Sequence, residues 1–380
     1  MILNENSDKK IIPVAGGKGG VGKSVLAANI ALSMALNGKK TVLVDLDLGG
    51  SNLHTILGIK NSNPGIGNYI SGRKYSIEDI TYPTEWENLY FIPGDSLVAG
   101  ISELTRAVKK KIIQGLLNID ADYVFIDLGG GSNFTVIDFF LISNSGLIVA
   151  TPQTTSIMNS YSFIKNYVFR FLQRAFAGDK EISKYLKKAA KEKSPGERLT
   201  VSRIIEDIKE INNGAAEKAE AFLEVLQPKL ILNKVERVED IALAEGLRDL
   251  TLNNLSINLE CLGTVMNDKL IDHSINLQRP YIIDSADSVT AQEINRIAVK
   301  IIQSRHFPEM PLELEYYSDS FELAQIETEN DLAGMQNESS PAETTDQRYD
   351  TEQLLELIRV QQTRIQELQS TLRILSMNQS

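Results

Sequence analysis

The chain has 380 residues, 42% hydrophobic and 23% charged, a composition typical of a globular protein with a sizeable core. No apolar run approaches the ~18 residues of a membrane-spanning helix, and the first ten residues (MILNENSDKK) lack the apolar stretch of a secretory signal. A single cysteine, Cys261, excludes an internal disulfide and any CxxC site. The net charge of −11 comes from residues 308–350, with twelve acids and one base, so it indicates nothing about substrates of the rest.

Residues 1–306 alternate short apolar strands with helical patterns, which predicts an α/β domain with a doubly wound, mostly parallel sheet. The expected strands are 10–15, 41–46, 89–93, 122–128, 146–151, 229–233 and 259–265. The expected helices are 22–37, 102–118, 155–176, 238–250 and 289–305. The segment from Thr151 to Pro228 is too long for one crossover helix, and its spacing predicts a helical insertion at about 178–227.

Two further segments follow this domain. Residues 307–350 are acidic and aperiodic, which predicts a disordered linker. Residues 351–380 regain heptad periodicity and predict a coiled-coil helix. Its heptad positions are Leu354, Ile358, Gln361, Ile365, Leu368, Leu372 and Leu375. A lone helix of this length is marginal in water, so we expect it to bind a protein partner.

The string GGKGGVGKS (16–24) directly follows the first expected strand and precedes the first expected helix. It contains the phosphate-binding pattern GxxxxGK[ST], whose backbone N–H groups and helix N-terminus bind phosphate oxygens. We expect Lys23 to contact the β- and γ-phosphates and the Ser24 hydroxyl to ligate Mg²⁺. The predicted nucleotide-binding residues of this loop are Gly17, Gly19, Gly20, Val21, Gly22, Lys23, Ser24 and Val25.

A second lysine, Lys18, opens the loop, and KGGVGKS resembles the deviant P-loop of the MinD/ParA family of ATPases. Later family motifs are resembled, in order, by VLVDLDLGGSNLHTILG (42–58), VFIDLGGG (124–131), KLILNKV (229–235) and LGTVMNDKLIDHSINLQRPYII (262–283). Together these segments cover most of residues 10–306. The resemblance implies a P-loop NTPase fold, ATP and Mg²⁺ as ligands, and an ATP-dependent homodimer.

Four polar residues, Asp45, Asp47, Asp127 and Asn233, fall at the carboxyl ends of expected strands, where a doubly wound sheet binds its ligands. Carboxylates beside a triphosphate need an intervening cation, so we expect Asp45 and Asp127 to hold Mg²⁺ through water. The resemblance implies that Asp47 orients the attacking water, that Lys18 touches the partner's phosphates and that Asn233 faces adenine. Residues 233–236 (NKVE) differ by one residue from the guanine-reading NKxD, and we favour ATP over GTP.

The insertion carries six lysines and two acids across 180–193. This stretch is either a solvated helix face or a weak contact for DNA or an anionic membrane.

These features favour an ATP-hydrolysing dimerisation switch that positions or partitions a cell division site, flagellum, chromosome or polar complex. We expect it in the cytoplasm or at the inner face of the cell membrane. One alternative is a metal or iron–sulfur carrier of the same superfamily, which needs thiolates that Cys261 alone does not supply. A less favoured alternative is a bacterial-type tyrosine kinase, for which Tyr316, Tyr317 and Tyr349 form a thin cluster and Gly49 replaces the expected arginine. The sequence does not identify the cargo.

Overall fold

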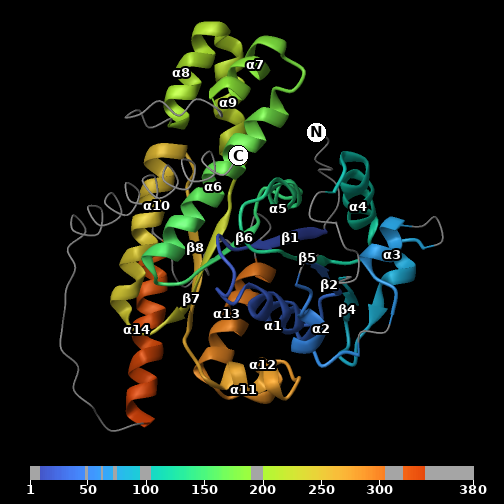
Figure 1. Ribbon diagram of the computed structural model, residues 1–380. Coiled ribbons are helices and arrows are strands. Elements are labelled where there is room, and N and C mark those ends of the chain that lie inside the picture. Colours follow the sequence, from blue (N-terminus) through green and yellow to red (C-terminus); the bar gives the residue numbers. More distant parts are fainter. Residues whose placement is uncertain are drawn as a thin grey trace, which may run out of the picture.

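A computed structural model describes residues 9–47, 50–60, 63–71, 75–94, 104–189, 200–303 and 320–338. One eight-stranded sheet runs through it, in the order β3-β4-β2-β5-β1-β6-β7-β8 (Figure 1). All neighbouring strands are parallel except β3 and β4. The strands are β1 (Lys10–Ala15), β2 (Thr41–Leu46), β3 (Tyr82–Pro83), β4 (Leu89–Ile92), β5 (Tyr123–Leu128), β6 (Leu147–Ala150), β7 (Lys229–Val235) and β8 (Glu260–Met266).

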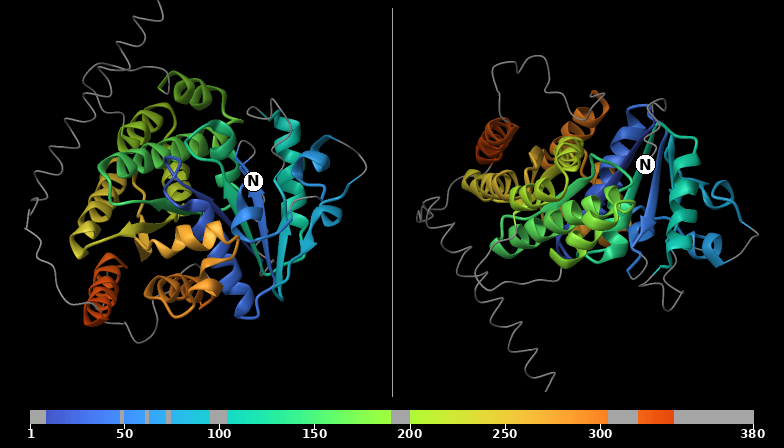
Figure 2. Two further views of the ribbon diagram at one scale, coloured as in Figure 1. Left: turned by 60° about the horizontal axis from the view of Figure 1, so that its bottom comes forward. Right: turned by 90° about the horizontal axis from the view of Figure 1, so that it is seen from above.

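Helices cover both faces of this sheet (Figures 1 and 2). The first eight are α1 (Lys23–Leu36), α2 (Leu53–Ile56), α3 (Ile66–Ser71), α4 (Arg106–Asn118), α5 (Phe134–Phe140), α6 (Thr154–Ala175), α7 (Lys180–Ala189) and α8 (Val201–Ile211). The others are α9 (Asn213–Glu224), α10 (Ile241–Leu255), α11 (Leu270–Asn276), α12 (Tyr281–Asp284), α13 (Val289–Gln303) and α14 (Ser320–Glu338). Two single 3₁₀ turns, Glu78–Ile80 and Val238–Asp240, complete the described elements.

The core consists of two apolar layers, one on each face of the sheet. On one face, α1 and α13 bury side chains such as Ile30 and Ile297. On the other face, α4, α5 and α6 bury a second set in which Phe140 meets Phe163 edge-to-face, with ring centroids 5.0 Å apart. The central strands are buried on both faces, which explains their nearly continuous apolar sequences.

The α/β class and the mostly parallel sheet are confirmed, and each expected strand is found within two residues of its expected ends. The short strand β3 was not expected. Its proline cannot donate a ladder hydrogen bond, and β3 lies at the sheet edge, where such a residue is tolerated. The stretch expected to form a helical insertion contains α7, α8 and α9, which lie together at the top of Figure 1.

The expectation of a disordered linker over residues 307–350 is wrong for Ser320–Glu338, because these residues form α14 against β8 and α10. The apolar content that a packed helix needs is concentrated on one face, where Phe321 and Ala324 are buried. The acids that suggested disorder instead pair with cations of α13. The predicted coiled coil at 351–380 lies outside the described residues. No described helix is long and apolar enough to cross a bilayer.

Candidate functional site

The phosphate-binding loop connects β1 to α1, and its backbone requires glycine at particular positions. Gly22 has a φ of 89° and a Cβ there would lie 2.2 Å from the Nδ2 atom of Asn233. At Gly17 a Cβ would lie 2.3 Å from the backbone carbonyl carbon of Asn159 in α6. The loop is therefore clamped between β7 and α6, and neither glycine can carry a side chain in this arrangement.

One side of the loop is open. A Cβ at Gly19 or Gly20 would meet no atom within 4 Å, and Lys18 is exposed beside them. The loop that follows β5 lies close by, since the N–H of Gly131 donates to the carbonyl of Gly16 at 3.2 Å. Backbone amides of the phosphate-binding loop thus border space that a phosphate group can enter.

Lys23 and Asp127 form a buried ion pair at the start of α1. The Lys23 Nζ atom donates to Asp127 Oδ1 at 2.5 Å and to the Ser24 hydroxyl at 3.3 Å. The two side chains are 8% and 1% exposed, so solvent screens the pair little. Burial raises the pKa of Asp127, whereas Lys23 opposes that rise. The lysine expected to hold phosphate is therefore held by a carboxylate expected to hold Mg²⁺.

Asp45 lies beside Asp127 in the sheet, since the two residues are register partners on β2 and β5. Its carboxylate is buried and accepts hydrogen bonds from the Ser51 hydroxyl at 2.6 Å and from the N–H of Asp47 at 3.1 Å. Burial, followed by the charge of Asp127, raises the pKa of Asp45 to about 7. Asp47 is half-buried, and its carboxylate lies next to Gly129.

The end of β7 contributes Asn233 to the same site. Its Nδ2 atom donates to the carbonyl of Val21 at 2.8 Å, while its buried Oδ1 atom has no partner among the described residues. The next residue, Lys234, has a φ of 61° and donates to the carbonyl of Gly20 at 3.4 Å. Val21 is buried and Val25 is half-buried, so both contribute packing and backbone groups rather than exposed side chains.

Two of these residues were not identified from the sequence. Ser51 orders the Asp45 carboxylate, and its signal is the polar pair Ser51-Asn52 after the DxD strand. Lys234 brings a cation over the phosphate-binding loop, and its signal is the pair Asn233-Lys234 at a strand end. Every residue expected at the site from sequence lies on this loop, in the first turn of α1 or toward the carboxyl ends of β2, β5 and β7.

The residues present fit a nucleotide with Mg²⁺. The open glycine backbone and Lys23 suit phosphates, and the unpartnered Oδ1 atom of Asn233 requires a hydrogen-bond donor such as a base amino group. The Ser24 hydroxyl and the carboxylates of Asp45 and Asp127 are the hard oxygen donors that Mg²⁺ prefers. The arrangement can therefore bind a nucleoside triphosphate and stabilise charge on its phosphates.

Comparison with known proteins gives a family. A family profile described as "ParA: NUBPL iron-transfer P-loop NTPase" matches residues 7–168. The chain is 33% identical to the flagellum site-determining protein YlxH of Helicobacter pylori over 169 residues, 43% of this chain and 55% of that protein. It is 30% identical to the septum site-determining protein MinD of Escherichia coli K12 over 178 residues, 47% of this chain and 65% of that protein. The matches thus span less than two thirds of these relatives.

Solved structures show the same fold. The MinC:MinD cell division protein complex of Aquifex aeolicus gives a TM-score of 0.51 at 19% identity, covering 80% of this chain and 98% of that chain. A ParA family ATPase of Chlorobium tepidum gives 0.50 at 15% identity, covering 77% and 99%. The fold and the P-loop with its second lysine agree with these matches, and residues 7–168 match the MinD/ParA family of P-loop NTPases.

Proposed function

We propose that this protein is an ATP-binding and ATP-hydrolysing dimerisation switch that positions or partitions a cellular structure, with the division site and the flagellum as its first candidates. The supporting observation is the phosphate-binding loop, in which buried Lys23 and exposed Lys18 flank an open glycine backbone. The printed names of two relatives, which determine the septum site and the flagellum site, favour these two structures.

In this proposal the residues divide the work by position. The loop amides and Lys23 bind the phosphates, and Asn233 faces the adenine. Ser24 binds Mg²⁺ directly, whereas Asp45 and Asp127 hold it through water. When bound, Mg²⁺ neutralises charge that develops on the phosphoryl group. Asp47, next to Gly129 and near the open side of the loop, orients the attacking water.

Lys18 makes hydrolysis depend on dimerisation. It is exposed at the open side of the loop, where its charge can reach the phosphates of a nucleotide held by a second copy. A cation supplied in trans stabilises charge in phosphoryl transfer and is absent from the monomer. The dimer is then the form that hydrolyses ATP, and hydrolysis causes the dimer to dissociate.

Further contacts belong to the same proposal. Residues 351–380 bind a protein partner as a coiled coil. Helix α7 of the insertion carries four lysines and one acid, Glu181, which favours weak contact with DNA or an anionic membrane. We place the protein in the cytoplasm or at the inner face of the membrane. Replacing Lys184, Lys187 and Lys188 with Gln should preserve hydrolysis, and cosedimentation with DNA and with vesicles tests the contact.

A metal-carrier function is less favoured, although the matching family profile is named for iron transfer. Cys261 is buried in β8, its Sγ atom faces the carbonyl of Gly263 at 3.8 Å, and burial raises its thiol pKa to about 12. A protonated, buried thiol is a poor ligand for a soft metal.

Phosphate release and molar mass in solution test the proposal. The wild type should release phosphate from ATP and shift from monomer to dimer when ATP and Mg²⁺ are added. Lys23→Ala should lose nucleotide binding, Lys18→Ala should bind ATP without dimerising, and Asp47→Ala should remain an ATP-bound dimer. Lys218→Ala, at an exposed position of α9, is the control. Equal loss of ATP affinity in Lys18→Ala and Lys23→Ala would refute the trans role of Lys18.

A further inference from the structure

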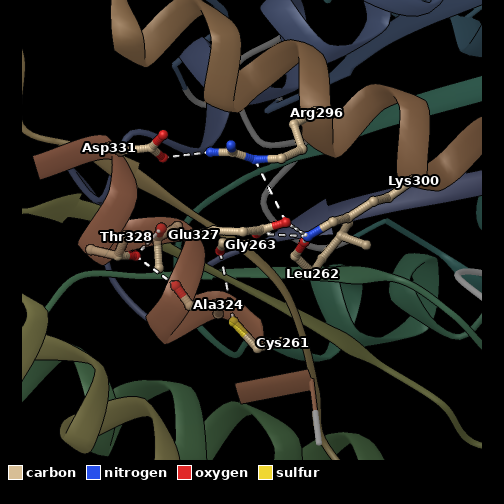
Figure 3. A network of polar contacts seen from close by, with 10 residues as sticks. Cys261, Leu262, Gly263, Arg296, Lys300, Ala324, Glu327, Thr328 and Asp331 are labelled. Atoms are coloured by element: carbon tan, nitrogen blue, oxygen red, sulfur yellow. Dashed lines mark hydrogen bonds and ion pairs between the residues drawn. The ribbon is translucent and has the colours of Figure 1, made fainter. Parts of the chain in front are cut away.

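The helix α14 packs in a docking site that β8, α10 and α13 form on the nucleotide-binding domain (Figure 3). Phe321, Ala324 and Thr328, spaced along one face of α14, are buried there. The hydroxyls of Thr328 and Thr264 of β8 are 2.7 Å apart, and the Arg248 guanidinium of α10 lies 4.7 Å from the centre of the Phe321 ring. Apolar packing and polar contacts together therefore hold the helix on the domain.

Charge complementarity adds to this dock. The Lys300 Nζ atom of α13 lies 2.7 Å from Glu327 and donates to the carbonyl of Leu262 at 3.2 Å. The Arg296 Nη2 atom lies 2.5 Å from Asp331. The side chains of both acids and of Lys300 are at most 15% exposed, so solvent screens these ion pairs less than it screens ordinary surface ion pairs.

One residue of α13 links this dock to the end of β8. Glu293 is fully buried, and its Oε2 atom accepts a hydrogen bond from the N–H of Met266 at 2.8 Å. Its Oε1 atom has no hydrogen-bond partner among the described residues, although Asp331 of α14 lies near enough for its charge to act on the Glu293 carboxyl. Burial and then the charge of Asp331 raise the pKa of Glu293 well above its usual range. Asp331 itself pairs with Arg296, three residues along α13 from Glu293.

Met266 ends β8 at the nucleotide-binding edge of the sheet. It is the register partner of Val235, and the next residue, Asn267, donates from its backbone to the Val235 carbonyl at 3.0 Å. The Asn267 side chain donates to Glu236 at 2.7 Å. Asn233, which holds the phosphate-binding loop, precedes these contacts on β7. The end of β8 therefore braces the part of β7 that faces the base.

We propose that Glu293 is a positioning residue of the nucleotide site and that α14, which pairs with Arg296 and Lys300 of the same helix α13, couples the C-terminal segment to nucleotide binding. This inference rests on the proposed nucleotide binding. Docked α14 holds α13 in place through the two ion pairs, Glu293 of α13 fixes the N–H of Met266, and the end of β8 is then preorganised for the nucleotide. Coupling between two binding events is reciprocal, so bound nucleotide must hold α14 in place by the same factor.

Fluorescent-ATP titration of the full chain, with Mg²⁺, tests the effect of Glu293 and docked α14 on nucleotide affinity. Glu293→Ala should raise the Kd about tenfold, within the usual range of such couplings. Glu293→Gln should stay within about twofold of the wild type, because its amide oxygen can still accept from the N–H of Met266. Phe321→Asp, which undocks α14 without touching the site, should raise the Kd by about the same factor as Glu293→Ala. Gln325→Ala, on the exposed side of α14, is the matched control.

Hydrogen exchange of the 320–338 amides tests the other direction. Adding ATP and Mg²⁺ should slow exchange in the wild type by about the factor seen in the Kd, and should have little effect on exchange in Glu293→Ala. Wild-type affinity in both Phe321→Asp and Glu293→Ala, or unchanged exchange on nucleotide addition, would overturn the inference and leave the proposed function standing. A wild type that binds no nucleotide would instead overturn both.

Discussion

The buried pair of Lys23 and Asp127 predicts an unusually strong dependence of nucleotide binding on Mg²⁺. Lys23 is the cation that pairs with Asp127 among the described residues, and a phosphate that recruits Lys23 removes it from a carboxylate that is 1% exposed. Separating a buried ion pair costs about 3 kcal/mol at the low end of the usual range, and protonation of Asp127, whose pKa burial raises, lowers this cost. Without Mg²⁺ to take over Asp127, the Kd should therefore rise by up to about 150-fold.

Asp127→Asn isolates this effect, because it removes the charge that Lys23 must leave. In excess EDTA the variant should bind ATP about 30-fold more tightly than the wild type, and it should gain little when Mg²⁺ is restored. Titration calorimetry with EDTA or Mg²⁺ measures both values. Asp120→Asn, which breaks the exposed pair with Lys40, is the matched control and should change neither. Equal wild-type and Asp127→Asn affinities in EDTA would show that the pair survives binding and would refute the reasoning.

Three further predictions concern the loop and the core. Gly17→Ala should lower the Tm and abolish nucleotide binding, because its Cβ would lie 2.3 Å from the α6 backbone, whereas Gly19→Ala should keep the Tm and lose about tenfold in affinity. Asp138→Asn should cost about 2 kcal/mol in urea unfolding, since this buried carboxylate pairs with three cations; an unchanged midpoint would contradict it. Glu293, whose pKa burial raises to about 8, binds a proton that the unfolded chain loses between pH 4.5 and 8, so stability should fall as pH rises through that window. In Glu293→Gln the difference in unfolding free energy between pH 5 and pH 8 should be smaller by at least ~1 kcal/mol.

Much of the fold follows from sequence because local signals and burial agree. Each central strand is buried on both faces, so it is an apolar run that ends at a polar residue, as Asp45 and Asp127 show. The phosphate-binding loop is equally predictable from the sequence. Gly17 is required by the close approach of the α6 backbone, and Gly22 is required by its positive φ. Those constraints act on single residues, and they are therefore visible in the chain itself.

Contacts between distant segments cannot be predicted from the sequence in this way. The sequence could not indicate that Lys23 pairs with Asp127, since each residue alone suits a ligand that is bound later. It also could not indicate α14, where the apolar contribution is small. Phe321 and Ala324 are the buried apolar residues there, and the remaining contacts depend on cations of α10 and α13 that lie far away in the chain. Acidic composition predicts disorder only when no complementary surface exists.

Docking of α14 also changes how far the C-terminal segment can reach. With α14 in place, thirteen peptide steps separate Glu338 from Thr351, so the predicted coiled coil must begin within about 45 Å of the end of α14. With α14 undocked, forty-eight steps separate Gln303 from Thr351, and the limit rises to about 160 Å. Because the accessible volume grows with the cube of that reach, undocking lowers the effective concentration of the segment near any partner held at the domain surface. Under the proposed coupling, a nucleotide that stabilises docked α14 therefore concentrates residues 351–380 near the nucleotide-binding domain.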